Sequence, residues 1–567
     1  MNPIIKFQNF TWQYNAQAEP TLHEINLEIN EGEKVLICGP SGCGKSTLAH
    51  CINGLIPFSY RGESSGSLTI FGREAKTLSL FDISKMVGTV LQDSDGQFVG
   101  LTVAEDIAFA LENDCVPQKE LYERVAGVAR EVSVGEHLHH APTELSGGQK
   151  QRVSLAGVMV DDVPVFLFDE PLANLDPATG KQAIELIDEI RRTRNATVII
   201  IEHRLEDVLW RDVDRVILMQ DGRIAADVTP DQLLSSDLLK TYGIREPLYI
   251  TALKYAGVEI SPEKSPRSIR SVKLSDEDIK AVKNWYLAAP GTTSDAESPV
   301  LLDAQHITFA YDNGRKALDD VSIRVRKGEM LAIVGRNGAG KSTFSKLVCG
   351  FEKPQKGSLS FKGRDLMELS IKERADSIGY VMQNPNQMIS QVLIADEVGL
   401  GLKTRGVPED EIARRVEETL KICGLYPFRK WPVSALSYGQ KKRVTIASIL
   451  VLDPEIIILD EPTAGQDFRH YTEIMEFLRE INRRGITVVM ITHDMHLMLE
   501  YCDRAVVLAD GKKLADTGCA AVLTDPGLIE RASLKLTSLY DLALLCGIAD
   551  AEGFVRRFIA FDREVRS

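Results

Sequence analysis

Three common sequence features are missing from this chain. Its nine cysteines are scattered without a Cys-x-x-Cys pair, which argues against a disulfide framework or a zinc site and fits reduced thiols in a cytosol. Met1 to Phe10 does not follow the basic, apolar, small-residue order of a signal peptide. No apolar run approaches the roughly 18 residues needed to cross a bilayer. The sequence therefore predicts no transmembrane segment of its own.

An excess of positive charge is also missing. The 567 residues include 66 Lys and Arg against 81 Asp and Glu, a net charge of -15. This balance argues against nucleic acid as a partner. The length exceeds what one hydrophobic core usually serves, so roughly two to four domains are expected. Short apolar runs such as Val198–Ile201 have the length of buried parallel strands.

A glycine-rich loop with the spacing Gly-x-x-x-x-Gly-Lys-Ser occurs in each half of the chain, directly after an apolar strand. Glycines let the backbone wrap a phosphate chain, and the following helix points its N–H groups at anionic oxygens. The lysine adds positive charge, and the serine hydroxyl suits the Mg²⁺ that travels with a nucleotide. The predicted nucleotide-binding loop residues are Gly39, Pro40, Ser41, Gly42, Cys43, Gly44, Lys45, Ser46 and Thr47, and Gly335, Arg336, Asn337, Gly338, Ala339, Gly340, Lys341, Ser342 and Thr343.

An acidic pair follows a wholly apolar strand in each half, Asp169-Glu170 and Asp460-Glu461. Adjacent strand residues diverge, so the two carboxylates can serve different tasks. We expect each aspartate in the magnesium shell and each glutamate to orient or deprotonate the water that attacks the γ-phosphate. A random acidic pair is usually solvated surface, but one that ends a buried strand beyond a phosphate loop is not typical of chance.

Other motifs recur in the same order. A further strand ends in His203 and in His493, in a place suited to touch the γ-phosphate or polarise water, although a lone histidine is more often structural. Serine turns open a helix at Leu145–Gln149 and at Leu436–Gln440. Such a turn is a second anion site or, more commonly, a plain helix cap.

Each half also carries a tyrosine on an early strand, Tyr14 and Tyr311. The ring is placed to stack on an adenine, with core or surface packing as the alternative.

The ordered set of phosphate loop, glutamine, serine turn, acidic pair and histidine, present twice, resembles the ATP-binding subunits of ABC transporters. The resemblance implies an α/β fold of two tandem RecA-like P-loop domains, each with a helical subdomain and a small antiparallel β part. It also implies two composite sites for ATP and Mg²⁺, closed head to tail. One would combine Tyr14, Lys45, Ser46, Gln92, Asp169, Glu170 and His203 with Ser437 and Gly439. The other would combine Tyr311, Lys341, Ser342, Gln383, Asp460, Glu461 and His493 with Ser146 and Gly148. Gln92 and Gln383 are expected among the metal ligands.

The second serine turn departs from the family pattern, because Tyr438 stands where Gly147 stands in the first. A Cβ there is expected to restrict φ, so that the site containing Lys45 would close somewhat differently, and the sequence leaves open whether the two sites turn over equally.

Finer features, such as Leu91–Val99 and Glu461–Asp467, are similar to the ATPases of energy-coupling factor (ECF) vitamin and metal importers, including fused versions assigned to hydroxymethylpyrimidine or thiamine uptake. This resemblance implies an integral membrane coupling protein and a small substrate-binding membrane protein as partners. It places the chain at the cytoplasmic face of a bacterial-type cell membrane as a peripheral subunit.

Two other classes share the ATPase motifs. Soluble twin ATPases that act on ribosomes usually have a strongly charged helical connecting arm and a basic surface, whereas Ser261–Pro299 is short and the chain is acidic. DNA-repair ATPases would carry zinc-binding cysteine clusters. We therefore favour the transporter class.

The repeat predicts four segments. These are a first ATP-binding domain at 1–245, a helical tail and linker at 246–299, a second ATP-binding domain at 300–535 and a C-terminal helical tail at 536–567. Within the linker, Ser275 is expected to cap a helix running from Asp276 to Leu287.

Overall fold

The computed structural model describes residues 3–91, 96–173, 175–288, 298–312, 314–464 and 466–566. The chain divides into two compact units, Met1–Val282 and Lys283–Ser567. The boundary falls inside helix α12 (Asp276–Leu287), whose bounds confirm the sequence prediction. Ser275 Oγ accepts from the backbone N–H of Asp278 at 3.2 Å, so the predicted cap is also present.

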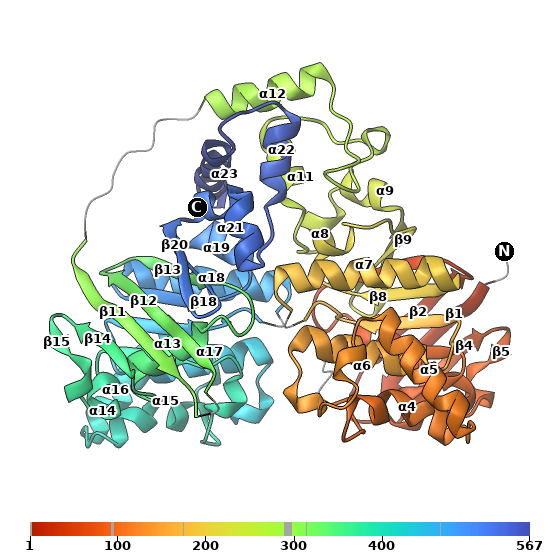
Figure 1. Cartoon of the computed structure of the whole chain (residues 1–567), viewed down its shortest axis with the longest axis horizontal. Helices are drawn as coiled ribbons and strands as arrows, with labels where there is room; N and C mark the ends of the chain where they lie inside the picture. Colours follow the sequence, from red (N-terminus) through yellow and green to blue (C-terminus); the bar gives the residue numbers. More distant parts are fainter. Residues whose placement is uncertain are drawn as a thin grey trace. The chain divides into compact units, whose positions relative to one another are not determined.

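In the described part of the first unit, a four-stranded antiparallel sheet accompanies a six-stranded, mostly parallel sheet (Figure 1). The antiparallel sheet has the order β2–β1–β4–β5, with β1 (Pro3–Tyr14), β2 (Leu22–Asn30), β4 (Gly62–Ile70) and β5 (Arg73–Glu74). The larger sheet has the order β10–β9–β3–β8–β7–β6, with β3 (Lys34–Cys38), β6 (Val87–Val90), β7 (Val165–Asp169), β8 (Thr197–Ile201), β9 (Arg215–Gln220) and β10 (Arg223–Val228).

The α-helices of the first unit fall into three groups. Those near the sheets are α1 (Lys45–Ile52), α2 (Leu55–Phe58), α3 (Leu80–Ser84), α7 (Pro177–Arg194) and α8 (Leu205–Val208). The helical subdomain contains α4 (Val103–Asn113), α5 (Gln118–Glu131) and α6 (Gly147–Met159). The C-terminal part contains α9 (Pro230–Leu234), α10 (Leu238–Thr241) and α11 (Leu248–Tyr255).

The described part of the second unit repeats both sheets. The strands are β11 (Val300–Ala310), β12 (Lys316–Arg326), β14 (Lys356–Phe361) and β15 (Arg364–Asp365) in the order β12–β11–β14–β15, and β13 (Met330–Val334), β16 (Ile378–Val381), β17 (Ile456–Asp460), β18 (Thr487–Ile491), β19 (Arg504–Ala509) and β20 (Lys512–Gly518) in the order β16–β17–β18–β13–β19–β20. The helices are α13 (Lys341–Cys349), α14 (Ile371–Arg374), α15 (Ile394–Lys403), α16 (Glu409–Ile422), α17 (Tyr438–Leu450), α18 (Phe468–Arg483), α19 (Met495–Tyr501), α20 (Cys519–Thr524), α21 (Pro526–Ala532), α22 (Ser538–Leu545) and α23 (Ala551–Arg566).

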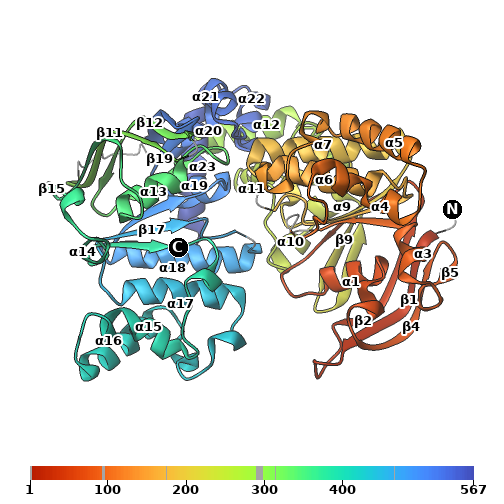
Figure 2. The same ribbon diagram turned by 60° about the horizontal axis from the view of Figure 1, so that its bottom comes forward.

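The helical subdomain of the second unit has its own apolar core. Buried residues of α15, α16 and α17 pack together, and Figure 2 shows these helices at the end of the unit opposite β11 and β12. With an antiparallel part, a mostly parallel α/β core and a helical subdomain in each unit, the structure confirms the predicted fold class. Among the described residues, no helix combines the length and the hydropathy that a bilayer crossing requires.

The central strand β3 explains the position of the first phosphate loop. All five of its residues are buried, and it pairs in parallel with β8 on one side and β9 on the other. In the sheet order, β7 and then β6 follow β8. Because parallel strands end at one edge, the segments that follow β3, β8 and β7 meet there. The same order brings the segments after β13, β18 and β17 together in the second unit.

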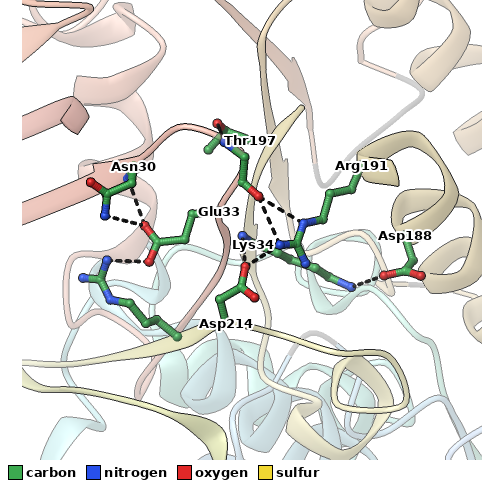
Figure 3. A network of polar contacts seen from close by, with 9 residues as sticks. Asn30, Glu33, Lys34, Asp188, Arg191, Thr197 and Asp214 are labelled. Atoms are coloured by element: carbon green, nitrogen blue, oxygen red, sulfur yellow. Dashed lines mark hydrogen bonds and ion pairs between the residues drawn. The ribbon is translucent and has the colours of Figure 1, made fainter. Parts of the chain in front are cut away.

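A polar network fixes the opposite end of β3 (Figure 3). The Lys34 side chain is fully buried, and its Nζ lies 3.4 Å from Asp188 Oδ1 on α7. Asp214 accepts from the backbone N–H of Lys34 at 2.8 Å and from Arg191 Nη2 at 2.6 Å. Burial lowers the pKa of Lys34, and the Asp188 charge opposes this shift. The start of β3 is thus tied to α7 and to the segment before β9, which anchors the strand that leads into the loop.

Candidate phosphate-binding and catalytic sites

Each phosphate loop follows a central strand and runs into a helix, β3 into α1 and β13 into α13. Gly44 and Gly340 precede these helices with φ of +99° and +101°, a region that favours glycine. A Cβ on Gly340 would lie only 2.4 Å from the backbone O of Ala317. The turn and the packing beneath it both require glycine.

The loop lysines are held by their own loops. Lys45 Nζ donates to the carbonyl oxygens of Gly39 at 2.9 Å and Pro40 at 2.8 Å. Lys341 makes the same two contacts in the second unit, at 2.7 and 3.0 Å. Both side chains are buried, so each ammonium charge is concentrated within the loop. This is the charge that a phosphate chain requires at such a loop.

The acidic pairs lie at the carboxyl ends of β7 and β17. Glu170 and Glu461 have φ of +49° and +45°, an uncommon conformation for residues with a side chain. The backbone N–H of Glu170 donates to the carbonyl O of Ile201 at 2.9 Å, and Glu461 makes the equivalent bond to β18. Strained backbone of this kind is found at functional sites, where surrounding bonds hold it in place.

A histidine contacts the glutamate in each unit. His203 Nε2 donates to Glu170 Oε1 at 2.5 Å, and His493 Nδ1 donates to Glu461 Oε1 at 2.7 Å. The predicted glutamate and histidine are therefore brought together twice, across neighbouring strands. Burial raises the pKa of Glu170, but the hydrogen bond and charge of His203 outweigh it, so that the pKa lies below its usual value.

The aspartates have the opposite electrostatic character. Burial, reinforced by the charge of Glu170, raises the pKa of Asp169 to about 6. Burial also raises the pKa of Asp460, although a hydrogen bond from Ser342 opposes the shift. A buried carboxylate beside a serine hydroxyl is a hard-oxygen pair of the kind that binds Mg²⁺, and a cation there would favour the ionised form. The residues present therefore fit the expected metal ion.

The two tyrosines lie against the phosphate-loop helices. Tyr14 Oη donates to Thr47 Oγ1 at 3.1 Å, and Tyr311 Oη and Thr343 Oγ1 are also 3.1 Å apart. The Tyr14 ring makes an edge contact with Trp12, with ring centroids 5.8 Å apart. These contacts place each ring next to its loop, and stacking on adenine stays a prediction.

The serine turns are helix caps in both units. Ser146 Oγ accepts from the backbone N–H of Gln149 at 3.4 Å, and Ser437 Oγ accepts from that of Gln440 at 3.3 Å. Each glutamine side chain returns a bond to the serine backbone N–H, which completes a capping box. Gly148 and Gly439 lie in the first turns of α6 and α17.

The structure corrects the expectation for Tyr438. Gly147 does not have positive φ, and a Cβ there would meet no atom of the described residues within 4 Å apart from its chain neighbours and its own helix backbone. Tyr438 is therefore accommodated as the first residue of α17 without backbone strain. The difference between the units lies in the side chain, because Tyr438 Oη donates to the carbonyl O of Gln383 at 3.3 Å.

Sequence reasoning missed two further polar residues of the second unit. Tyr380 Oη donates to Asp460 Oδ2 at 3.1 Å, and Lys442 Nζ donates to the carbonyl oxygens of Met382 and Gln383. Both stand close to predicted motifs, so a comparison of the two repeats position by position would have found them. Of the two predicted glutamines, Gln383 follows β16, whereas Gln92 lies outside the described residues.

Two α/β units, each with a phosphate loop, an Asp-Glu pair and a histidine at one sheet edge, define a tandem P-loop ATPase. A family model described as "ABC transporter" matches residues 22–173 and 318–464. A second model, described as "ATP-binding cassette cobalt transporter", matches residues 236–309.

Relatives that match the whole length of the chain are also ABC transporter ATP-binding proteins. An ABC transporter ATP-binding protein of Clostridium perfringens is 59% identical over 564 residues, covering 100% of this chain and 99% of the relative. One from Enterococcus faecalis is 57% identical over 565 residues, with the same coverage. A solved structure, cbiO1 from Clostridium perfringens, described as part of the ABC transporter complex cbiONQ, is 34% identical and covers 43% of this chain and 99% of its own, with a TM-score of 0.39.

The chain belongs to the ABC transporter ATP-binding proteins. It is an ATPase coupled to transport, as the family resemblance implies, and its resemblance to the ECF-type ATPases is confirmed by the cobalt-transporter model.

Proposed function

We propose that this chain is the energy-coupling subunit of an ECF-type import complex, in which ATP hydrolysis powers uptake of a vitamin-like small molecule or a metal ion. The observation that carries the ATPase part is the meeting of loop lysine, acidic pair and histidine at one sheet edge in both units. Because neither unit lacks a glutamate, both sites are competent for hydrolysis.

In each site the glutamate acts as the general base. The carboxylate of Glu170 or Glu461 accepts a proton from the water whose oxygen attacks the γ-phosphorus, and the bond to the bridging oxygen of ADP breaks. The histidine that is hydrogen-bonded to each glutamate holds the carboxylate in place. Because it follows a strand that ends at the same sheet edge as the phosphate loop, it is placed to contact the γ-phosphate. The loop lysine stabilises the charge of the phosphates.

Magnesium would be held by Ser46 and Asp169 in one site and by Ser342 and Asp460 in the other, with Gln92 and Gln383 as further ligands. When bound, it neutralises phosphate charge and orients the β- and γ-phosphates. The contribution of the chain is a carboxylate kept close to the serine hydroxyl, as Ser342 and Asp460 are.

Membership of the family supports composite sites. We propose that Ser437 and Gly439 complete the site containing Lys45, and that Ser146 and Gly148 complete the site containing Lys341. Each serine opens a helix whose N-terminal N–H groups suit a phosphate oxygen.

A pair of exposed apolar residues supports docking to a membrane protein. Leu101 is 82% exposed and Val392 is 75% exposed, and each immediately precedes the N-cap of the first helix in its helical subdomain. A carboxylate orders the segment before each: Asp106 Oδ1 accepts from the N–H groups of Val99 and Gly100 at 2.8 and 3.1 Å. Glu397 makes the matching bonds in the second unit. Ordered, exposed leucine and valine suit an apolar partner surface.

We propose that this partner is an integral membrane coupling protein, which in turn binds a small substrate-binding membrane protein. The chain would then lie peripherally at the cytoplasmic face of a bacterial-type cell membrane. The cobalt-transporter family model supports an importer of this kind.

Affinity purification from detergent-solubilised membranes tests the proposal. The tagged wild-type chain should recover a multi-span coupling protein and a small membrane-embedded binding protein. The double variant Leu101→Asp/Val392→Asp should lose both, while Tyr122→Asp, which changes another exposed apolar residue of the first helical subdomain, should retain them. Recovery of ribosomal proteins without any membrane protein would contradict the import function and leave the ATPase assignment intact.

A further inference from the structure

Helix α17, which the serine turn of the second unit opens, is bonded by two side chains to the backbone that follows β16. Lys442 is only 1% exposed, and its Nζ donates to the carbonyl oxygens of Met382 at 2.9 Å and Gln383 at 2.6 Å. Tyr438 stands four residues earlier on the same helix and donates to the same Gln383 oxygen at 3.3 Å. The i, i+4 spacing places both donors on one face of α17.

Burying the ammonium group that makes these bonds costs free energy, because the charge loses its hydration. Burial lowers the pKa of Lys442 to about 8, and the charges of Asp460 and Glu461 oppose the shift. A buried charge is stabilised only where hydrogen bonds and opposite charge compensate for lost water. For Lys442, the two carbonyl oxygens supply the hydrogen bonds, and Asp460 and Glu461 of the same unit supply the opposite charge.

The first unit is built differently at both positions. Gly147, next to the capping Ser146, has no side chain, and Gln151 takes the place of Lys442, five residues after the capping serine. Gln151 Nε2 donates to the carbonyl O of Pro171, in the segment after Glu170. The lysine and the tyrosine thus distinguish the second unit.

We propose that Tyr438 and Lys442 are positioning residues that latch the Gln383 segment to α17, so that the segment and the serine turn of the second unit move as one body. The inference rests on the proposed role of Gln383 at the metal ion. The latch would also connect the proposed docking residue Val392 with the proposed site residue Ser437. The Gln383 segment leads along the chain to Val392, and Ser437 opens α17. A displacement at the docking surface would be carried to Ser437 through this latch.

Hydrogen exchange of the full-length, nucleotide-free protein tests the latch directly. Lys442→Met keeps an unbranched chain but removes all donors, so we expect amides in residues 382–388 to exchange about tenfold faster, as for the loss of one or two hydrogen bonds to a charged group. Tyr438→Phe should give a smaller increase. Lys442→Gln, the residue of the first unit, retains an amide donor and should restore most of the protection. The control Lys421→Met, which changes an exposed lysine of α16, should leave the segment unchanged.

Steady-state kinetics then separates positioning from folding. Lys442→Met should lower kcat while KM for ATP stays within about twofold, because the loop lysines that hold ATP are untouched. Unchanged exchange in both Lys442→Met and Tyr438→Phe would overturn the latch, as would Lys442→Gln exchanging as fast as Lys442→Met. Faster exchange with unchanged kcat would support the latch and contradict the proposed role of Gln383.

Discussion

The two glutamates proposed as general bases have nearly the same backbone conformation but different neighbours. Glu170 accepts a hydrogen bond from His203 Nε2. Glu461 accepts one from His493 Nδ1 and another from Thr492 Oγ1 at 3.3 Å. The residue at the position of Thr492 in the first unit is Glu202. Its carboxylate accepts from backbone N–H groups, among them that of His203 at 2.8 Å. The fold fixes the position of the glutamate carboxylate, and the neighbouring side chains determine which hydrogen bonds it accepts.

The aspartates differ in the same way. In β16, Tyr380 pairs with Ile458, two residues before Asp460, and its hydroxyl reaches that aspartate. Thr89 pairs with Leu167 at the same register of the first unit, and its Oγ1 is buried without a hydrogen-bond partner among the described residues. Asp460 therefore accepts a hydrogen bond from the phenol of Tyr380, whereas the first unit has the shorter Thr89 side chain at the corresponding position of β6. Two sites with the same motifs in the same order can thus differ in the hydrogen bonds around the aspartate.

The largest expected effect tests whether both units hydrolyse ATP. Replacing Glu170 and Glu461 together by glutamine should lower ATP turnover by at least about 100-fold, because positioning survives but the general base is lost. ATP binding, measured with a fluorescent analogue, should persist. The single variants report how much each unit contributes to turnover, and Glu120→Gln, which changes an exposed glutamate of α5, is the control. Undiminished hydrolysis in the double variant would refute the assigned role.

The second prediction tests which loop each serine turn serves. Ser146→Arg should impair photolabelling by an ATP analogue in the loop containing Lys341, and Ser437→Arg in the loop containing Lys45, each by on the order of tenfold because a bulky cation replaces a phosphate donor. Peptide mapping identifies the labelled loop.

A control for the serine variants is available in the first unit. Ser79 makes the same capping box at α3, so Ser79→Arg removes a cap without touching a serine turn and should leave both loops labelled. Loss of labelling in the loop of the same unit as the changed serine would contradict the head-to-tail assignment.

The smallest effect concerns stability and pH. The folded pKa of Asp169 is about 6, above its unfolded value, so the unfolded chain loses this proton first and stability falls as pH rises from about 4 to 6. Asp169→Asn should therefore raise the free energy of unfolding of the nucleotide-free protein by on the order of 1–3 kcal/mol at pH 7, with the gain vanishing below about pH 4. Urea unfolding at several pH values measures it.

The comparison with the second unit sharpens this prediction. Asp460→Asn should give a gain of the same sign but smaller size, because hydrogen bonds from Ser342 and Tyr380 oppose the effect of burial on the Asp460 carboxylate. Adding the control Tyr380→Phe should enlarge the gain. Equal gains at the two positions, with or without Tyr380, would show that these bonds do not distinguish the units.

The sequence alone predicted an ATPase and the order of the motifs in each half. Glycine spacing, an acidic pair after a buried strand and a histidine after the next are local signals, because short-range geometry dictates which residues can turn, end a strand or cap a helix. The helix after Ser275 was predictable for the same reason. Repetition made these signals specific, since each motif recurs in the same order.

Only the tertiary structure decided how those parts are held. The pairing of His203 with Glu170, the raised pKa of Asp169 and the burial of Lys442 depend on parallel strands meeting at one edge, and residues far apart in sequence meet there. The effect of Tyr438 also escaped local reasoning. Its Cβ costs nothing on the helical backbone, and its influence comes through a hydroxyl that reaches Gln383, 55 residues earlier in the chain.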